Sequence, residues 1–153
     1  MAATLRPADH GENRMLLSLL AAAVASSTNV DCATAVPAFM ASYAADLQAG
    51  NRAAIAGRYS AGGAYSLGYE AKSFDSAAAI ARRYTGAEWQ KPDAFAWQAL
   101  SVEQLGPGAC LATGGFRWTQ GAGSMDFAYT AVLRAEPAGL RILLEHENPL
   151  PKK

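Results

Sequence analysis

His146 is the side chain in this sequence best suited to acid–base chemistry. It is one of two histidines, and the other, His10, lies in a segment near the N-terminus with separate features of its own. A neutral imidazole changes its charge near physiological pH, so His146 could act as a general base or polarise a bound group. The alternative is a structural histidine whose ring nitrogens are bound by neighbouring backbone or tyrosine hydroxyl groups.

The strand expected at residues 140–148 decides which way His146 points. Strict alternation puts the even-numbered residues from Leu140 to His146 on one face and the odd-numbered residues from Arg141 to Glu147 on the other. The first set is the more apolar, so we predict that it faces the core and that His146 faces the interior. Glu145 and Glu147 are then expected at the surface or in a dimer contact.

Two further carboxylates are candidates for a part in such chemistry. Asp126 lies on an expected strand between Met125 and Phe127. If it points inward it could pair with His146 and fix its tautomer, and if it points outward it is a solvated strand residue. Glu70 follows an expected short strand and could overhang the mouth of a pocket. No two carboxylates have a spacing that predicts an acid–base pair.

The aromatic residues indicate an apolar interior. Eight of them are considered together: Tyr59, Tyr65, Trp89, Trp97, Phe116, Trp118, Phe127 and Tyr129. A small domain cannot bury so many rings without using most of them as core. A few would remain to line a pocket for a small hydrophobic molecule. The residues predicted to contact that molecule are Tyr59, Tyr65, Trp97, Trp118 and Phe127.

The elements that must position these side chains follow from periodicity. Apolar residues recur at the spacing of one helix face between residues 31 and 50, and Asn51 can cap a second, short helix through Tyr59. A short strand is expected at residues 64–67 and a third helix after Phe74, ending at Gly86. Four strands follow, at residues 95–105, 110–119, 125–134 and 140–148, with Gly or Pro at each joint. Helices first and strands last predict an α+β fold.

Composition bounds the function classes. The 153 residues suit one domain, and 13 basic residues balance 13 acidic ones, which argues against nucleic acid as the main partner. There is no P-loop, dinucleotide fingerprint, histidine cluster for a metal or Gly-x-Ser-x-Gly motif. We therefore expect no cofactor and no metal. Cys32 and Cys110 lack metal-ligand spacing; buried free thiols are favoured, and a disulfide becomes plausible if the protein is exported.

Residues 1–30 have two interpretations. Arg6 and Arg14 precede the apolar run from Met15 to Ala25, and Ala23-Val24-Ala25 resembles a cleavage site. This layout is typical of a secretory signal peptide, and the run is too short to span a bilayer. We expect a periplasmic or secreted protein if residues 1–25 are a signal peptide. The alternative is an extra N-terminal helix on a cytoplasmic protein.

The order of these elements resembles the NTF2-like superfamily, with its cystatin-like α+β fold, and especially its SnoaL-like and DUF4440-type branches. The resemblance is carried by FMASYAADLQAGNRAAIAGRYSAGGAY and by VLRAEPAGLRILLEHENP, and it spans roughly residues 33–149. It implies a domain over residues 31–153, a cone of three N-terminal helices packed on a curved antiparallel sheet. It also implies an interior pocket and a homodimer formed through the sheet. Ala61-Gly62-Gly63 departs from the family, which usually has acidic residues there.

Ketosteroid isomerase, an enzyme of this superfamily, tests the resemblance further. Tyr43 lies eight residues before Asn51, as the donor tyrosine of that enzyme lies before its own Gly-Asp hinge. The matching base position falls near Ser66-Leu67-Gly68 and the partner acid near Ala131, and neither carries a carboxylate. The resemblance thus leaves three hypotheses: a pocket that binds a small hydrophobic molecule, a pocket enzyme using His146 with Tyr43 or Asp126, and a dimerisation module without catalysis.

Overall fold

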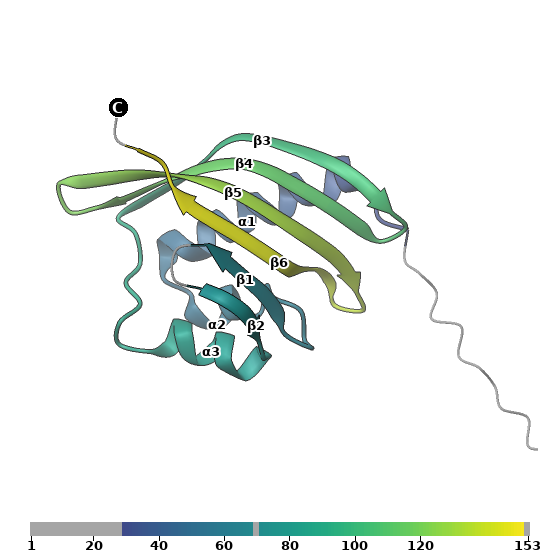
Figure 1. The fold of residues 1–153 in the computed structure, drawn as a ribbon, viewed down its shortest axis with the longest axis horizontal. Helices are drawn as coiled ribbons and strands as arrows, with labels where there is room; N and C mark the ends of the chain where they lie inside the picture. Colours follow the sequence, from purple (N-terminus) through teal and green to yellow (C-terminus); the bar gives the residue numbers. More distant parts are fainter. Residues whose placement is uncertain (1–28, 69–70, 152–153) are drawn as a thin grey trace, which may run out of the picture.

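The computed structural model describes residues 29–68 and 71–151 (Figure 1). The predicted signal peptide or extra helix therefore lies outside the described residues, apart from its last two positions. Glu70, predicted to overhang a pocket, also lies outside them.

Helix α1, Cys32–Ala49, carries the expected inner face. The carboxylate of Asp31 caps its first turn by accepting from the Ala33 N–H, and Gly50 ends it with a φ of 70°. Val36, Met40, Tyr43 and Leu47 are buried along one side. Helix α2, Arg52–Ala56, is shorter than predicted because Tyr59 leaves the helix to bridge Ile142 of the last strand.

The short strand expected at residues 64–67 is present, and it forms a hairpin with a second strand that was not predicted. Strand β1, Ala64–Gly68, pairs antiparallel with β2, Ala71–Asp75, and helix α3, Ala77–Thr85, comes after both. The expected helix-first order is therefore only partly right, because β1 and β2 separate α3 from the other two helices in the described chain. Strands β3, Ala94–Gly106, β4, Ala109–Gln120, β5, Gly123–Glu136, and β6, Gly139–Pro149, complete the fold.

The six described strands form one sheet in the order β2-β1-β6-β5-β4-β3. All neighbours are antiparallel except β1 and β6, which run parallel, so the sheet is mixed and not wholly antiparallel as predicted. Figure 1 shows the long strands curving over α1, with α2 and α3 gathered beside β1 and β2. The core lies in this concavity, where Met40, Ile55, Ile80, Leu133 and Ile142 are fully buried.

A disulfide ties the start of α1 to β4. The Sγ atoms of Cys32 and Cys110 are 2.00 Å apart and their Cα atoms 5.7 Å apart. The interpretation favoured from the sequence, two buried free thiols, is therefore wrong. Because neither cysteine has a local motif and the two are 78 residues apart, only the packing of α1 on the sheet brings them together.

Candidate ligand pocket

A bulge in β6 decides which side chains face the interior. Val132 of β5 pairs with Leu144 while the next residue, Leu133, pairs with Ile142, so Leu143 has no partner in this ladder. One extra residue in a strand reverses the faces of everything after it. Ile142 thus lies in the core before the bulge, and Glu145, only 7% exposed, lies on the inner face after it.

His146 accordingly lies on the other face, and the prediction that it points into the interior is wrong. Its ring is half-buried, and its Nε2 is 3.0 Å from the Nδ2 atom of the Asn148 amide. His146 pairs with Leu67 where β6 meets β1 and is absent from the cavity lining. Strict alternation failed because it took no account of the bulge at Leu143.

A cavity of about 670 Å³ opens between the concave sheet and the helices. Its wall combines aromatic rings with a small number of polar groups. The lining residues from the helices and their connections are Tyr43, Leu47, Tyr59, Arg83, Tyr84 and Trp89; those from the strands are Ser66, Leu67, Gly68, Phe95, Trp97, Phe116, Trp118, Met125, Phe127, Glu145 and Glu147.

The aromatic wall is a continuous stack on β3, β4 and β5. The Phe116 ring stacks on Phe127 at 4.7 Å and on Phe95 at 5.2 Å, and Trp97 meets Phe95 edge-on at 4.9 Å between centroids. Offset and edge-on ring pairs of this kind add stability beyond their buried area. The inner face of these strands is therefore a preformed apolar surface.

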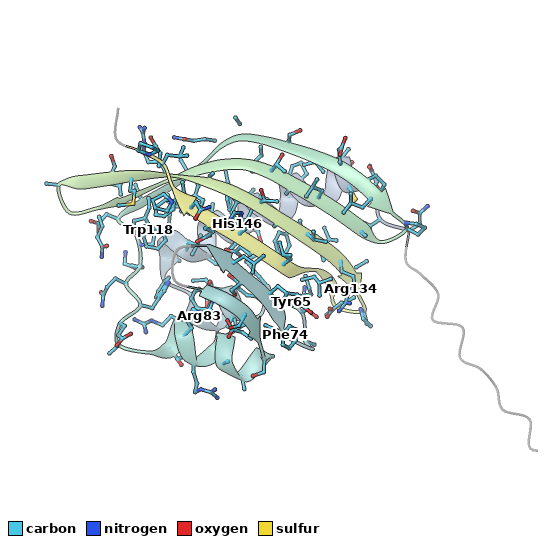
Figure 2. All side chains as sticks on the ribbon, viewed as in Figure 1. Tyr65, Phe74, Arg83, Trp118, Arg134 and His146 are labelled. Carbon is cyan, nitrogen blue, oxygen red and sulfur yellow. A yellow bond between two sulfur atoms is a disulfide. The ribbon has the colours of Figure 1, made fainter. Side chains whose placement is uncertain are left out.

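Four of the five predicted ligand-contacting residues line this cavity: Tyr59, Trp97, Trp118 and Phe127. The fifth, Tyr65, does not. It is 49% exposed and packs against the Phe74 ring of β2 at 5.2 Å. Figure 2 shows the two residues together, and Trp118 well apart from them near the far end of β6. Tyr65 alternates with the buried Ser66, which takes the inward position on β1.

Three tyrosine hydroxyls form a chain at one end of the cavity. The hydroxyls of Tyr43 and Tyr59 are 3.1 Å apart, and those of Tyr59 and Tyr84 are 2.6 Å apart. Burial, followed by the charge of Glu145, raises the pKa of each of the three well above its usual value of 10.0. All three therefore stay protonated at neutral pH, and the chain can offer a neutral donor to a bound group.

Two carboxyls accompany the tyrosines. Burial raises the pKa of Glu147 well above its usual 4.5, and the neighbouring carboxyl of Glu145 raises it further, against the opposing charge of Arg83. Two buried polar atoms, Glu145 Oε2 and the Tyr129 hydroxyl, have no hydrogen-bond partner among the described residues. Two carboxyl groups, one of them with an oxygen that no described residue binds, thus belong to the lining of a mainly apolar space.

Two arginines hold the rim in place. Arg83 donates to the Ser66 hydroxyl at 3.3 and 3.4 Å and forms an ion pair with Asp75. Arg52 donates to the carbonyl oxygens of Tyr84, Gly86 and Trp89 at 3.0, 2.8 and 3.0 Å. Its guanidinium also lies 5.2 Å from the Trp89 ring. The end of α3 and the following loop are therefore fixed to α2 by one side chain.

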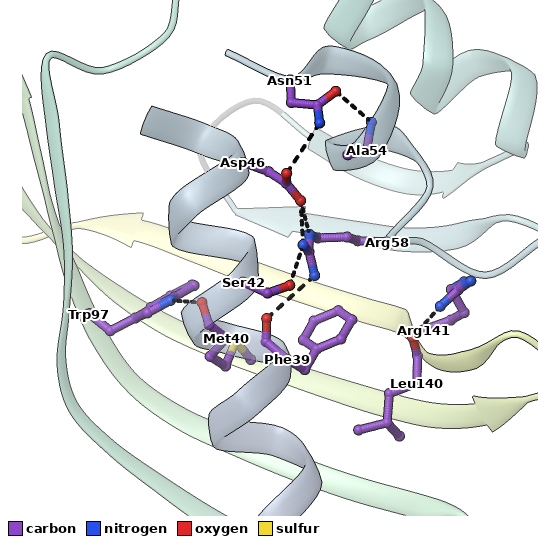
Figure 3. Close-up of polar contacts among 10 residues, drawn as sticks. All are labelled: Phe39, Met40, Ser42, Asp46, Asn51, Ala54, Arg58, Trp97, Leu140 and Arg141. Carbon is purple, nitrogen blue, oxygen red and sulfur yellow. Dashed lines mark hydrogen bonds and ion pairs between the residues drawn. The ribbon is translucent and has the colours of Figure 1, made fainter. Parts of the chain in front are cut away.

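A third arginine fastens α1 to the segment after α2 (Figure 3). Arg58 forms an ion pair with Asp46 and donates to the Phe39 carbonyl at 3.4 Å. In the same view the Trp97 indole donates to the Met40 carbonyl at 2.8 Å, which orients that ring. The aromatic wall and the tyrosine chain are thus anchored to the same helix.

Asp126 lies on the outer face, which settles the two orientations left open by the sequence. Both of its oxygens accept from Arg117 at 2.8 Å, and Gln98 donates to Oδ1 at 3.3 Å. It alternates with Met125 and Phe127, whose side chains line the cavity. The suggested pairing of an inward Asp126 with His146 is therefore wrong. Tyr43, by contrast, does line the cavity as expected for a donor.

Glu145, Glu147, Tyr84 and Arg83 were missed as pocket residues. The doubled apolar pair Leu143-Leu144 inside an alternating strand was the available signal, because it marks a point where the register can shift. Nothing comparable marks Tyr84 or Arg83, whose positions depend on how α3 packs against β1 and β2.

No family model matches the sequence, and no curated protein matches it. Solved structures do. An NTF2-like protein of unknown function from Shewanella oneidensis has a TM-score of 0.64 at 10% identity, covering 74% of this chain and 95% of its own. A ketosteroid isomerase-like protein from Erwinia carotovora has a TM-score of 0.61 at 12% identity, and the match covers 77% of this chain and 95% of that protein. The chain has the NTF2-like fold. An NTF2-like protein with a cystatin-like fold from Novosphingobium aromaticivorans has a similar structure, with a TM-score of 0.60 at 18% identity. The match covers 78% of this chain and 82% of that protein.

At these identities the likeness carries the fold alone. Among the described residues, no helix is long and apolar enough to cross a membrane. No cluster of three or more histidine, cysteine or acidic side chains is arranged to hold a metal ion in residues 29–68 and 71–151. The chemistry of the pocket must therefore be argued from its own side chains.

Proposed function

We propose that this domain binds a small hydrophobic molecule in the cavity between the sheet and the helices. The observation that carries the proposal is the cavity itself, about 670 Å³, walled by stacked rings and closed at one end by hydroxyls and carboxyls. Pockets for small molecules commonly have this size and this mixture of apolar wall with few polar groups. The polar end would orient the ligand and the rings would bury its body.

The three tryptophans of the chain make the test direct. Trp89, Trp97 and Trp118 all line the cavity, so their fluorescence responds to occupancy. Purified protein is titrated with the uncharged probe N-phenyl-1-naphthylamine, and co-purified small molecules are identified by mass spectrometry. Trp118→Ala should weaken probe binding about tenfold through loss of a buried ring, with the exposed Leu105→Ala as the matched control. Absence of both probe binding and any co-purified molecule would contradict the proposal.

A second candidate is an enzyme of the cyclase, isomerase, dehydratase or hydrolase kind. It is favoured by the Glu145–Glu147 pair, because the raised pKa of Glu147 suits a general acid that lies beside a second carboxyl. Tyr43 and its two partner tyrosines would stabilise developing negative charge. A catalytic role for His146 stays a prediction. Because its ring lies on the outer face, we expect the His146→Ala variant to keep the activity of the wild type. The Glu145→Gln variant should lose that activity.

The finer assignment to a SnoaL-like or DUF4440-type branch also stands as a proposal, supported by the order of elements between residues 33 and 149.

Dimerisation through the sheet is supported by the outer face of β1 and β2. Tyr65 and Phe74 are 49% and 50% exposed and pack on each other there. Exposed rings of this kind are typical of contact surfaces. Sedimentation of the wild type and of a Tyr65→Ser, Phe74→Ser double variant tests it; a wild-type monomer at all concentrations would rule it out.

A further inference from the structure

Acidic side chains outnumber basic ones in the lining of the cavity. Glu145 and Glu147 are the acidic groups in its lining, and the tyrosines beside them are neutral. The single basic group, Arg83, is ion-paired with Asp75 at the rim and keeps 40% of its side chain exposed. A ligand inside the cavity therefore meets two acidic groups and one basic group, and the charge of that basic group is shared between Asp75 and Glu147.

Glu145 supplies the specific contact. Its side chain comes from the inner face of β6, is more than nine-tenths buried and lines the cavity. Its Oε2 atom accepts no hydrogen bond from any described residue. A buried carboxylate oxygen without a donor costs several kcal/mol in a protein interior. A ligand that brings a donor, and above all a charged one, would recover that cost.

The aromatic rings of the lining also favour a positively charged ligand. Trp89, Trp97 and Trp118, together with Phe95, Phe116 and Phe127, surround the space in front of the two carboxyls. The faces of aromatic rings carry negative electrostatic potential, and tryptophan attracts cations most strongly. An anion would be repelled by both the rings and Glu145, and a neutral ligand would gain only a weak hydrogen bond.

We propose that the cavity selects hydrophobic amines in their protonated form, with the ammonium group donating to the Glu145 carboxyl group and the apolar body lying among the rings. This inference rests on the proposed binding function and names its ligand class. Glu147, beside Glu145, lies within reach of the same positive charge. The oxygens of the tyrosine chain can accept the remaining ammonium hydrogens.

Three probes with one apolar body test the proposal: adamantan-1-amine, adamantan-1-ol and adamantane-1-carboxylate. Their affinities are measured at pH 7 by calorimetry and by tryptophan fluorescence. We expect the ammonium compound to bind about tenfold or more tightly than the alcohol, as for one charged hydrogen bond, and the carboxylate to bind weakest.

Glu145→Gln provides the matched variant, since it keeps the shape and removes the charge. It should abolish the preference for the ammonium compound, because its neutral amide has no charge to attract the ammonium group, and continued binding of N-phenyl-1-naphthylamine shows that the pocket is intact. Glu103→Gln, at an exposed position of β3, should keep the preference. Equal binding of amine and alcohol by the wild type, or a preference that survives Glu145→Gln, would overturn the amine proposal alone. Failure of N-phenyl-1-naphthylamine and all three probes to bind would overturn the binding function as well.

Discussion

Glu145 lies directly opposite Ala131 in the ladder between β5 and β6. On its other side the same residue pairs with Ser66 of β1. The sequence comparison with ketosteroid isomerase had looked for carboxylates near those two neighbouring positions and found none. The carboxylate stands on the strand between them, so the centre of the concave sheet is acidic after all. This placement does not restore the isomerase mechanism, but it gives the cavity a titratable group that can be tested.

The tyrosine chain should stabilise the fold as well as the site. Tyr59→Phe removes the hydroxyl that links Tyr43 and Tyr84, leaving two buried hydroxyls without that partner. We expect a loss of about 1–3 kcal/mol in the free energy of unfolding, measured by urea denaturation. Tyr65→Phe is the control, because that hydroxyl is on an exposed ring, and it should change the free energy by less than about 0.5 kcal/mol. Equal effects of the two substitutions would contradict this role.

Glu147 should make the stability of the protein fall as pH rises. Its pKa is higher in the folded protein than the usual 4.5, so between 4.5 and the raised pKa the folded state binds more protons than the unfolded state. The contribution is complete below 4.5 and is lost as pH rises through that window. Glu147→Gln stays neutral throughout and should remove this slope. Urea denaturation at a series of pH values compares the two, and parallel curves would show that Glu147 titrates normally.

Proton release should accompany amine binding. A cation beside Glu147 favours its ionised form, so at a pH where Glu147 is protonated the ammonium ligand should displace its proton. Affinity for adamantan-1-amine should then increase as pH rises toward the pKa of Glu147. Calorimetry in two buffers with different ionisation enthalpies counts the released protons. Glu147→Gln should release none, and an equal count for both proteins would exclude Glu147 as the source.

Arg52 is expected to position Tyr84 and Trp89. Arg52→Ala deletes three hydrogen bonds to carbonyl oxygens of the α3 end and its loop, which should cost about 1–3 kcal/mol of stability and weaken probe binding. Arg82→Ala removes an exposed charge from the same helix and serves as the control. If both variants bind N-phenyl-1-naphthylamine like the wild type, Arg52 has no positioning role.

The disulfide should contribute more stability than any single side chain above. Removing it with Cys110→Ser in a Cys32→Ser background should lower the free energy of unfolding by about 2–5 kcal/mol. A reductant should reproduce most of that loss in the wild type and none in the double variant. Persistent disulfides are typical of oxidising compartments, so we propose that the protein is exported. Fusion of residues 1–30 to a periplasm-dependent reporter tests this, and an inactive fusion would count against export.

The sequence predicted the strands well because their ends are marked by residues with strong local preferences. Strands β3 to β6 begin and end within two residues of the expected bounds, at turns rich in Gly and Pro. Strand β1 was expected at residues 64–67, but its partner β2 escaped prediction because it has only five residues and little alternation to read. Short elements of this kind are stabilised by their neighbours in the sheet and not by their own sequence.

The site was harder to predict than the fold for one physical reason. The predicted aromatic wall was largely correct, since rings with period two on well-defined strands have one sensible orientation. The predicted orientation of the polar side chains of β6 was wrong. The single unpaired residue Leu143 reverses the faces of the strand, so Glu145 and not His146 lies on the inner face. A bulge is decided by the pairing of two strands, and no local preference in residues 140–148 prescribes it.

The parallel pairing of β1 with β6 has a consequence for how the protein folds. Residues 65–67 can join the sheet only once residues 144–146 are in place, near the far end of the chain. Contacts between such distant residues form late, because the long intervening loop must close first. The helices and the β3–β5 meander can form earlier from local contacts. Closing the β1–β6 junction then completes the sheet and the acidic end of the cavity in one step, so a partly folded chain should have no competent pocket.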